Sequence, residues 1–118
     1  MAKPVVREKS FAFALRVVKL YQYLVEKKRE FVLSKQLLRS GTAIGALVRE
    51  AEQGESTADF IHKMAIALKE AHETEYWIDL LHQSSYLDDK GHASIKTDLT
   101  EILKLLTSII KTTKANRS

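Results

Sequence analysis

The stretch that decides the fold is Ser34-Lys-Gln-Leu-Leu-Arg-Ser-Gly-Thr-Ala-Ile-Gly-Ala-Leu-Val-Arg-Glu-Ala51, followed by Asp59-Phe-Ile-His-Lys-Met-Ala-Ile-Ala-Leu-Lys-Glu-Ala-His-Glu-Thr-Glu-Tyr-Trp-Ile-Asp-Leu-Leu81. Apolar residues recur in both halves at the three- and four-residue spacing of an amphipathic helix. The first half also carries small residues at helical spacing, which allow close approach to its backbone. The second half mixes apolar residues with many acidic ones. Both halves predict long helices, and neither contains a catalytic motif.

The composition limits the class of protein. The chain has 118 residues, enough for one domain with a core of its own. It has no cysteine, which excludes disulfides and thiolate metal sites. The first nine residues lack the apolar region of a signal peptide, and no apolar run approaches the roughly 18 residues that span a bilayer. We therefore expect a soluble cytoplasmic protein without a membrane partner.

The net charge of +4 is unevenly distributed along the chain. Residues 1–39 hold ten Lys and Arg against three Glu, a balance of +7. Residues 40–92 have a balance of −6, and residues 93–118 have a balance of +3. Such a chain can pair its own helices or present a basic face to a partner. Internal pairing with a solvated surface is the simpler interpretation, and a nucleic-acid interface is the main alternative.

Cap and turn residues divide the chain into four helices within a single domain, residues 1–118. Ser10 is a suitable N-cap for the first helix, and Gly54 is a suitable C-cap for the second. Ser56 or Thr57 caps the third, and Asp88–Gly91 has the composition of a turn. Short connections between long helices predict an all-α, antiparallel, up-down-up-down four-helix bundle. The expected helices span residues 10–28, 31–53, 57–84 and 93–113, and residues 114–118 form a frayed tail.

The first helix carries an unusually wide apolar sector. On ideal helix geometry, its apolar side chains fill roughly 220° of the circumference. A surface helix of a monomeric bundle needs a narrower stripe, so the contiguous sector indicates a homo-oligomer. Scattered surface hydrophobic residues, which are common, are the alternative. The residues of the sector are Phe11, Phe13, Ala14, Leu15, Val17, Val18, Leu20, Tyr21, Leu24 and Val25.

Gly41 and Gly45 lie about one turn apart on one face of the second helix. A glycine inside a helix costs about 1 kcal/mol relative to alanine. Two such residues predict that another element packs closely against this face. Another helix is the simpler candidate, and a phosphate backbone is the alternative.

A structural polar network is also expected. Glu75 falls in the apolar sector of the third helix, where a buried carboxylate needs a cationic or hydrogen-bonding partner. Arg39 and Arg49 of the preceding helix are the expected partners. Glu50 lies with Arg39 on the less apolar side of that helix and is expected to join the network.

No catalytic, cofactor or metal site emerges from the sequence. The histidines at positions 62, 72 and 82 are rotated by about 80° from one to the next on an ideal helix, so they do not share a face. Asp59-x-x-His62 and Asp89-x-x-His92 do not supply the Glu-x-x-His pairs of a di-iron bundle. There is no glycine-rich phosphate loop. We therefore expect a non-enzymatic protein without a cofactor or metal.

Two function classes remain. In the first, basic side chains bind RNA or DNA through phosphates without reading sequence. The absence of exposed aromatic residues among them argues against a dedicated single-strand binder. In the second class, the basic face of an interaction scaffold docks an acidic protein. The candidate nucleic-acid-binding residues are Lys9, Arg16, Lys19, Lys27, Lys28 and Arg29 near the first helix, and Lys96, Lys104, Lys111 and Lys114 on the last.

Five motifs lie in the second and third expected helices: Gln36-Leu-Leu-Arg-Ser-Gly-Thr-Ala-Ile-Gly45, Arg49-Glu-Ala51, Asp59-Phe-Ile-His-Lys-Met64, Ala67-Leu-Lys-Glu70 and Glu73-Thr-Glu-Tyr-Trp77. Together they resemble the bacterial four-helix-bundle family of 23S ribosomal RNA intervening-sequence proteins. The resemblance covers roughly residues 8–110. Leu47 departs from it, because the family pattern Ile-Gly-Ala-Asn places asparagine there. Any site that uses this asparagine is therefore not transferred.

The resemblance implies a particular assembly and a set of partners. It implies a left-turning antiparallel bundle assembled into a ring, usually a homopentamer. Genes of the family often lie inside intervening sequences of the large ribosomal RNA gene. A similar bundle serves as the accessory variability protein of diversity-generating retroelements, where it binds a reverse transcriptase and nucleic acid. The resemblance implies no enzymatic activity.

Overall fold

The computed structural model describes residues 4–117, and this part of the chain forms four helices and no strand. The helices are α1 (Pro4–Glu26), α2 (Leu33–Glu52), α3 (Thr57–Gln83) and α4 (Asp89–Asn116). The all-α, four-helix class expected from the sequence is confirmed. None of these four helices combines the length and the apolar character that a bilayer crossing requires.

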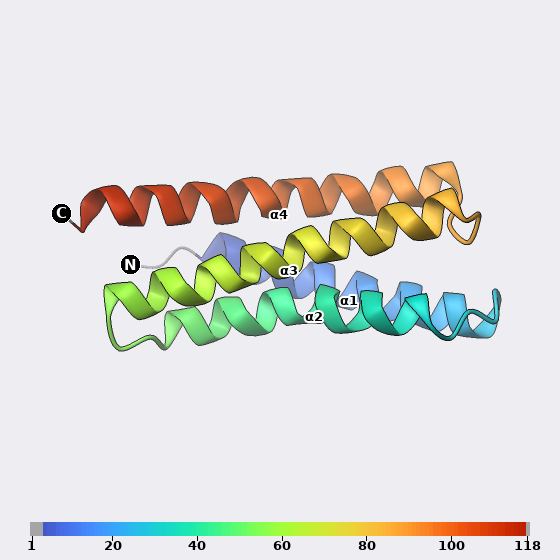
Figure 1. The fold of residues 1–118 in the computed structure, drawn as a ribbon, viewed down its shortest axis with the longest axis horizontal. Helices are drawn as coiled ribbons and strands as arrows, with labels where there is room; N and C mark the ends of the chain where they lie inside the picture. Colours follow the sequence, from blue (N-terminus) through green and yellow to red (C-terminus); the bar gives the residue numbers. More distant parts are fainter. Residues whose placement is uncertain (1–3, 118) are drawn as a thin grey trace.

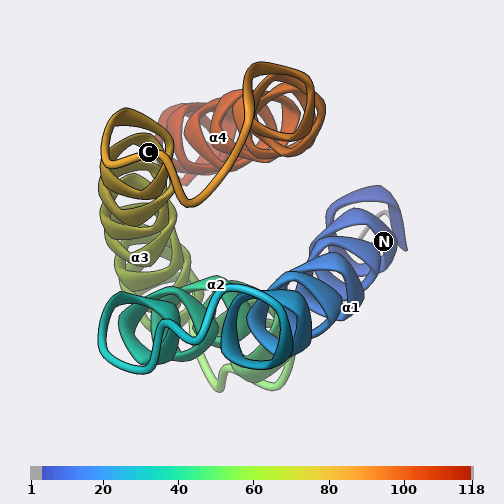
Figure 2. The same cartoon turned by 90° about the vertical axis from the view of Figure 1, so that its right-hand side faces the viewer.

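The helices lie side by side in an elongated body of 50 × 21 × 19 Å. Figure 1 shows that the chain reverses its direction at each connection, so that α1 begins and α4 ends at the same end of the body. We call this the terminal end. The α1–α2 and α3–α4 connections lie together at the other end, which we call the connection end and which faces the viewer in Figure 2. α1 and α4 touch each other less than the other neighbouring pairs do.

All four helices contribute to one hydrophobic core. The core runs the length of the body because each helix places an apolar side chain toward the centre about once per turn. Large side chains with no more than 1% of their surface exposed come from every helix. They include Phe13 and Leu24 of α1, Leu37 and Ile44 of α2, Ile78 and Leu81 of α3, and Leu99 and Leu106 of α4.

α2 packs against α1 through its glycine face. A Cβ atom added at Gly41 would lie 2.8 Å from Val17 Cγ2, and one added at Gly45 would lie 3.3 Å from the carbonyl oxygen of Ser10. The element that approaches these glycines is therefore a helix. Because Ser10 is small and fully buried, the two backbones can come this close.

The expected start of the first helix is wrong. α1 begins at Pro4, so Ser10 lies in its second turn and is no N-cap. Proline is well suited to the first turn of a helix because it lacks a backbone N–H that would need a partner. The Ser10 hydroxyl instead donates a hydrogen bond to the Arg7 carbonyl oxygen at 3.1 Å. A serine followed by apolar residues therefore has the local pattern of a cap without being one.

Two other expected boundaries are also wrong. α2 ends at Glu52 with Gln53 as its C-cap, and no glycine in the described residues has positive φ, so Gly54 is not a left-handed cap. Asp88 is the N-cap of α4 and accepts a hydrogen bond from the Gly91 N–H at 2.7 Å, so the expected turn is the start of a helix. α4 also continues through residues 114–116. The expected cap at Ser56 is confirmed, since its hydroxyl accepts from the Asp59 N–H.

The wide apolar sector of α1 is only partly covered by the other helices. Phe13 and Val17 are fully buried on its inner side. Val18 is half-buried, whereas Phe11 and Leu15 on the outer side keep 50% and 51% of their surface exposed. The guanidinium of Arg49 lies 5.1 Å from the centre of the Phe11 ring. An apolar flank of α1 therefore remains on the surface of the single chain.

Candidate nucleic-acid interface

Lys27, Lys28 and Arg29, which we call the basic cluster, follow the last residue of α1 at the connection end. The Glu30 N–H donates to the Leu24 carbonyl oxygen at 3.0 Å, which closes α1 with Arg29 in the left-handed region at φ 55°. Glycine or asparagine usually takes this position, because other residues pay about 1 kcal/mol for the left-handed conformation. All three basic side chains are exposed. The turn therefore projects three consecutive cations from the end of the molecule.

Glu30 fixes the geometry of this turn. Its carboxylate accepts hydrogen bonds from the backbone N–H groups of Val32 at 3.0 Å, Leu33 at 2.8 Å and Ser34 at 2.6 Å. These groups begin α2, and Val32, the N-cap residue, provides no side-chain cap. Burial raises the pKa of Glu30, but the hydrogen bonds from Leu33, Ser34 and Val32 outweigh it and hold the pKa below its ordinary value. Glu30 was not among the residues predicted from the sequence, although an acid close to the start of a helix is a favourable pattern.

We expect Glu30→Gln to lower the free energy of unfolding by about 1–2 kcal/mol at pH 7, because the amide keeps one acceptor and loses the charge. A carboxyl with a lowered folded-state pKa stabilises the fold above its unfolded pKa of about 4.3 and loses this effect as the pH falls through the folded value. The difference between wild type and variant should therefore shrink below about pH 4. Urea unfolding followed by circular dichroism measures both effects. Equal stability at pH 7 would show that this cap has no energetic role.

Three of the ten candidate binding residues are engaged with acids of α3 or α4. Lys9 Nζ lies 3.2 Å from Glu101, and Arg16 Nη1 lies 2.7 Å from Asp98. Lys96 Nζ lies 2.8 Å from Asp79, and this hydrogen bond raises the pKa of Lys96 more than burial lowers it. Lys96 therefore does not belong to an exposed lysine stripe on α4. The internal pairing of basic and acidic segments accounts for these three residues.

The other seven candidates are exposed and form no ion pair within residues 4–117. They do not make one continuous surface. The basic cluster lies at the connection end, whereas the three lysines of α4 belong to the second half of that helix, which leads to the terminal end. The seven residues are Lys19, Lys27, Lys28, Arg29, Lys104, Lys111 and Lys114.

Exposed aromatic residues accompany the basic cluster, which corrects the expectation that none would. Tyr23 and Phe31 keep 43% and 45% of their surface exposed. The guanidinium of Arg29 lies 5.1 Å from the centre of the Phe31 ring. Phe31 was expected to begin the second helix. α1 ends at Glu26 and α2 starts at Leu33, so Phe31 lies outside a helix and its ring is exposed.

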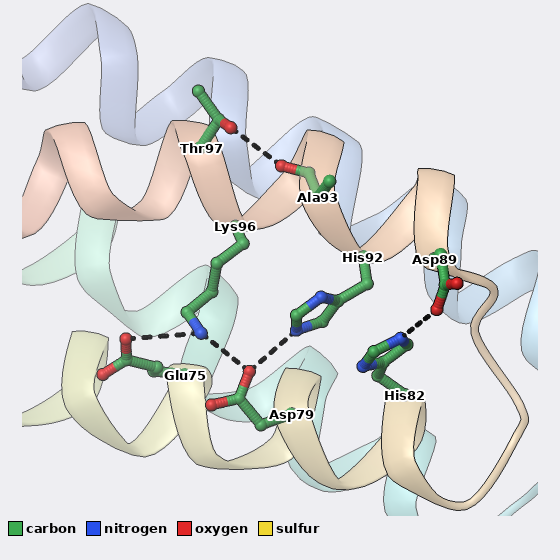
Figure 3. Close-up of polar contacts among 8 residues, drawn as sticks. All are labelled: Glu75, Asp79, His82, Asp89, His92, Ala93, Lys96 and Thr97. Atoms are coloured by element: carbon green, nitrogen blue, oxygen red, sulfur yellow. Dashed lines mark hydrogen bonds and ion pairs between the residues drawn. The ribbon is translucent and has the colours of Figure 1, made fainter.

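Two histidines meet at the same end of the molecule (Figure 3). The rings of His82 on α3 and His92 on α4 stack with centres 3.9 Å apart and planes 10° apart. His82 Nε2 lies 2.7 Å from Asp89 Oδ1, and His92 Nε2 lies 2.8 Å from Asp79 Oδ1. Burial raises the pKa of Asp79, but hydrogen bonds from His92 and Lys96 outweigh it and lower the pKa. Comparison of positions within one helix missed this pair, because its partners lie on two helices.

The expected polar network of Arg39, Arg49, Glu50 and Glu75 is wrong. Glu75 lies 3.6 Å from Lys96 and 3.8 Å from His72, so its cation comes from α4 and not from α2. Glu50 pairs with Lys63, and Arg49 packs on Phe11. Arg39 is exposed and forms no ion pair in the described chain. Arg49 therefore contacts α1, and Glu75 of α3 pairs with a cation of α4.

The side chains that could hold a metal ion are dispersed. Within residues 4–117 no group of three or more His, Asp or Glu side chains is placed to do so. Asp59 lies at the start of α3 with His62, whereas Asp89 and His92 lie at the start of α4, at the opposite end of the body. The two acid–histidine motifs therefore do not meet.

Comparison with known proteins identifies the family to which this sequence is similar. The sequence matches the 23S rRNA-intervening sequence protein family over residues 3–108. A crystal structure from Bacteroides thetaiotaomicron VPI-5482, of a protein with unknown function from the S23 ribosomal protein family, is 59% identical with a TM-score of 0.89. The similarity covers 90% of this chain and 98% of that one. A comparison with curated proteins gave no match.

Proposed function

Because this chain belongs to the 23S rRNA-intervening sequence protein family, we propose that it is a non-enzymatic nucleic-acid-binding protein. It binds RNA or DNA through phosphates, with the basic cluster as its main contact. The family is named for ribosomal RNA, which makes fragments of that RNA the first ligand to test. The protein acts without a cofactor, in the cytoplasm.

The observation that carries this proposal is the state of the basic cluster. Its three cations are consecutive, exposed and without an acidic partner in the described part of the chain. Lys9, Arg16 and Lys96, in contrast, are already paired. The left-handed conformation of Arg29 costs free energy at a position where glycine is ordinary, and strained positions of this kind gather at functional sites. A cation without an acidic partner can bind a phosphate without first breaking an ion pair within the protein.

We also propose that the chain forms an antiparallel, up-down-up-down bundle that assembles into a ring, a pentamer as the family resemblance implies. The exposed flank of α1, with Phe11 and Leu15, supports an interface between copies. A ring repeats the basic cluster once per subunit around an axis. Repetition converts weak contacts with a long nucleic acid into high avidity.

Val18→Glu is expected to dissociate the oligomer while leaving its helix content unchanged. Val18 is half-buried beside the exposed flank of α1, so a carboxylate there loses the rest of its hydration only when a neighbouring copy covers it. Light scattering measures the mass, and circular dichroism measures the helix content. Ala65→Glu, on an exposed position of α3, is the matched control and should leave the mass unchanged. A monomer mass for the wild type at micromolar concentration would refute the assembly.

A salt titration tests the proposed function. Binding of the wild type to labelled ribosomal RNA fragments and to a duplex of random sequence is measured by fluorescence anisotropy. Each neutralised phosphate contributes about −0.9 to the log–log slope on duplex DNA and about −0.7 on a single strand. We expect a slope steeper than about −2, since each subunit offers three cations. No binding to either nucleic acid at low salt would refute the proposal.

The alternative function is an interaction scaffold or accessory subunit. In that case the basic cluster docks an acidic protein surface, such as one on a reverse transcriptase. Electrostatic docking of this kind is also weakened by salt, so the salt slope alone does not separate the two functions. Binding to isolated nucleic acid at low salt does separate them, because the scaffold function does not require it.

A further inference from the structure

A cavity of about 570 Å³ lies at the connection end, directly beside the basic cluster. Lys28 of the cluster lines it, so the cavity and the cluster share a wall. Its other walls come from the last turns of α1 and from the α3–α4 connection, both of which face the viewer in Figure 2. Its volume is in the ordinary range for pockets that hold small molecules or parts of larger ligands.

Three of the side chains that line the cavity carry aromatic rings. Tyr23 comes from α1, Tyr86 from the α3–α4 connection, and His82 from the end of α3. The Tyr23 side chain is exposed, and Phe31, whose ring centre lies 5.1 Å from the Arg29 guanidinium, is a second exposed ring beside the basic cluster. Aromatic faces next to cations are the combination that binds single-stranded nucleic acids, because bases stack on the rings while phosphates contact the cations.

The wall at His82 is held in place. One nitrogen of its ring lies 2.7 Å from Asp89 Oδ1, and the ring stacks on His92, which lies 2.8 Å from Asp79 (Figure 3). The opposite side of the connection is fixed by Ser85 in the left-handed region at φ 71°, with the Tyr86 N–H donating to the Leu81 carbonyl oxygen at 2.9 Å. The cavity is therefore preformed, which lowers the entropic cost of binding.

The charge at the cavity rim is opposite to the charge of the basic cluster. Asp88 and Asp89 lie on its rim, so a phosphate group is repelled there and attracted to the cluster. Asp88 Oδ1 accepts from the Gly91 N–H and Asp89 Oδ1 bonds to His82, while the second oxygen of each carboxylate has no partner among the described residues. A free carboxylate oxygen accepts from an exocyclic amino group, as an acidic side chain does from cytosine N4.

From this arrangement we propose that the cavity receives one unpaired base of a single-stranded nucleic acid, preferably a base with an exocyclic amino group. The flanking phosphates contact the basic cluster. This inference rests on the proposed nucleic-acid binding and adds the class of ligand. A duplex is not a ligand of this kind. Its bases are stacked and paired, so none of them can enter the cavity at the connection end of the protein.

Binding of labelled oligonucleotides of about 12 residues tests the inference, since single-strand sites span roughly 4–16 nucleotides. The probes are oligocytidylate RNA, oligouridylate RNA and a random-sequence RNA duplex of equal length. We expect the wild type to prefer oligocytidylate over oligouridylate by about fivefold. Tyr23→Ala should weaken binding of oligocytidylate about tenfold and leave duplex binding unchanged, because it removes a stacking ring and no charge. Tyr23→Phe should bind as the wild type does.

Two further variants keep the test decisive. Tyr76→Ala removes an exposed tyrosine of α3 that does not line the cavity, and it should have no effect on binding. Asp89→Asn should reduce the preference for cytidine over uridine. Equal loss of single-strand and duplex binding in Tyr23→Ala, or equal affinity of the wild type for all probes, would overturn the base site and leave the proposed function intact. Absence of any binding by the wild type would overturn both.

Discussion

Replacing Lys27, Lys28 and Arg29 together with glutamate is expected to weaken nucleic-acid binding by about 100-fold or more at low salt. The change removes three consecutive exposed cations at the connection end and puts three negative charges in their place on every subunit. Fluorescence anisotropy measures the affinity. The fold should be retained, because the three side chains are exposed and Glu30 still caps α2.

A variant with the same change of net charge elsewhere is the matched control. Arg39, Lys69 and Arg117 are exposed, lie on three different helices or their ends, and are not candidate binding residues. Their joint replacement with glutamate should weaken binding only modestly, through the overall charge. If both triple variants lose binding equally, the protein binds through its total charge and the basic cluster has no special role.

Gly45→Leu is expected to lower the free energy of unfolding by about 3 kcal/mol, the upper end of the usual cost of overpacking. The new Cβ atom would lie 3.3 Å from the backbone carbonyl oxygen of Ser10, and the rest of the leucine side chain has no room between α1 and α2. The carbonyl oxygen of Ser10 is part of the backbone of α1, so it can move away from the leucine only if α1 itself shifts. Thermal and urea unfolding measure the loss.

Ala46→Leu is the control for this substitution. Ala46 is the next residue of α2 and is exposed, so the substitution introduces the same leucine side chain without a clash. Its melting temperature should stay close to that of the wild type. An unchanged melting temperature in Gly45→Leu would mean that α1 and α2 do not pack as closely as described.

Much of the fold could be predicted from local patterns, and the errors have a common cause. Helical periodicity placed the four helices, and Ser56 caps α3 as expected. Ser10 has the same local pattern as a cap, but it is buried under α2 opposite Gly45. Whether a serine caps a helix or fills a close helix contact depends on its neighbours in space, and the sequence around it does not contain them.

The position of the charged residues of the candidate site could be predicted from the sequence, but the residues that contact them could not. The run of three cations after α1 is visible in the sequence, but the pairing of Arg16 with Asp98 joins residues on the first and last helices. The stacking of His82 on His92 likewise depends on the way α3 and α4 meet at the connection end. A histidine three residues after Asp79 and another three residues after Asp89 form a matching pattern that could have indicated this contact.

Lysine footprinting tests the central claim most directly, because it locates the bound nucleic acid on the protein. Wild-type protein is acetylated with and without a saturating single-stranded RNA, and the modified lysines are quantified by mass spectrometry. Lys27 and Lys28 should be protected by the RNA, while Lys111 and Lys114 at the terminal end should react equally in both samples. Protection confined to Lys104, Lys111 and Lys114, or no protection at low salt, would contradict the assignment of the connection end as the nucleic-acid interface.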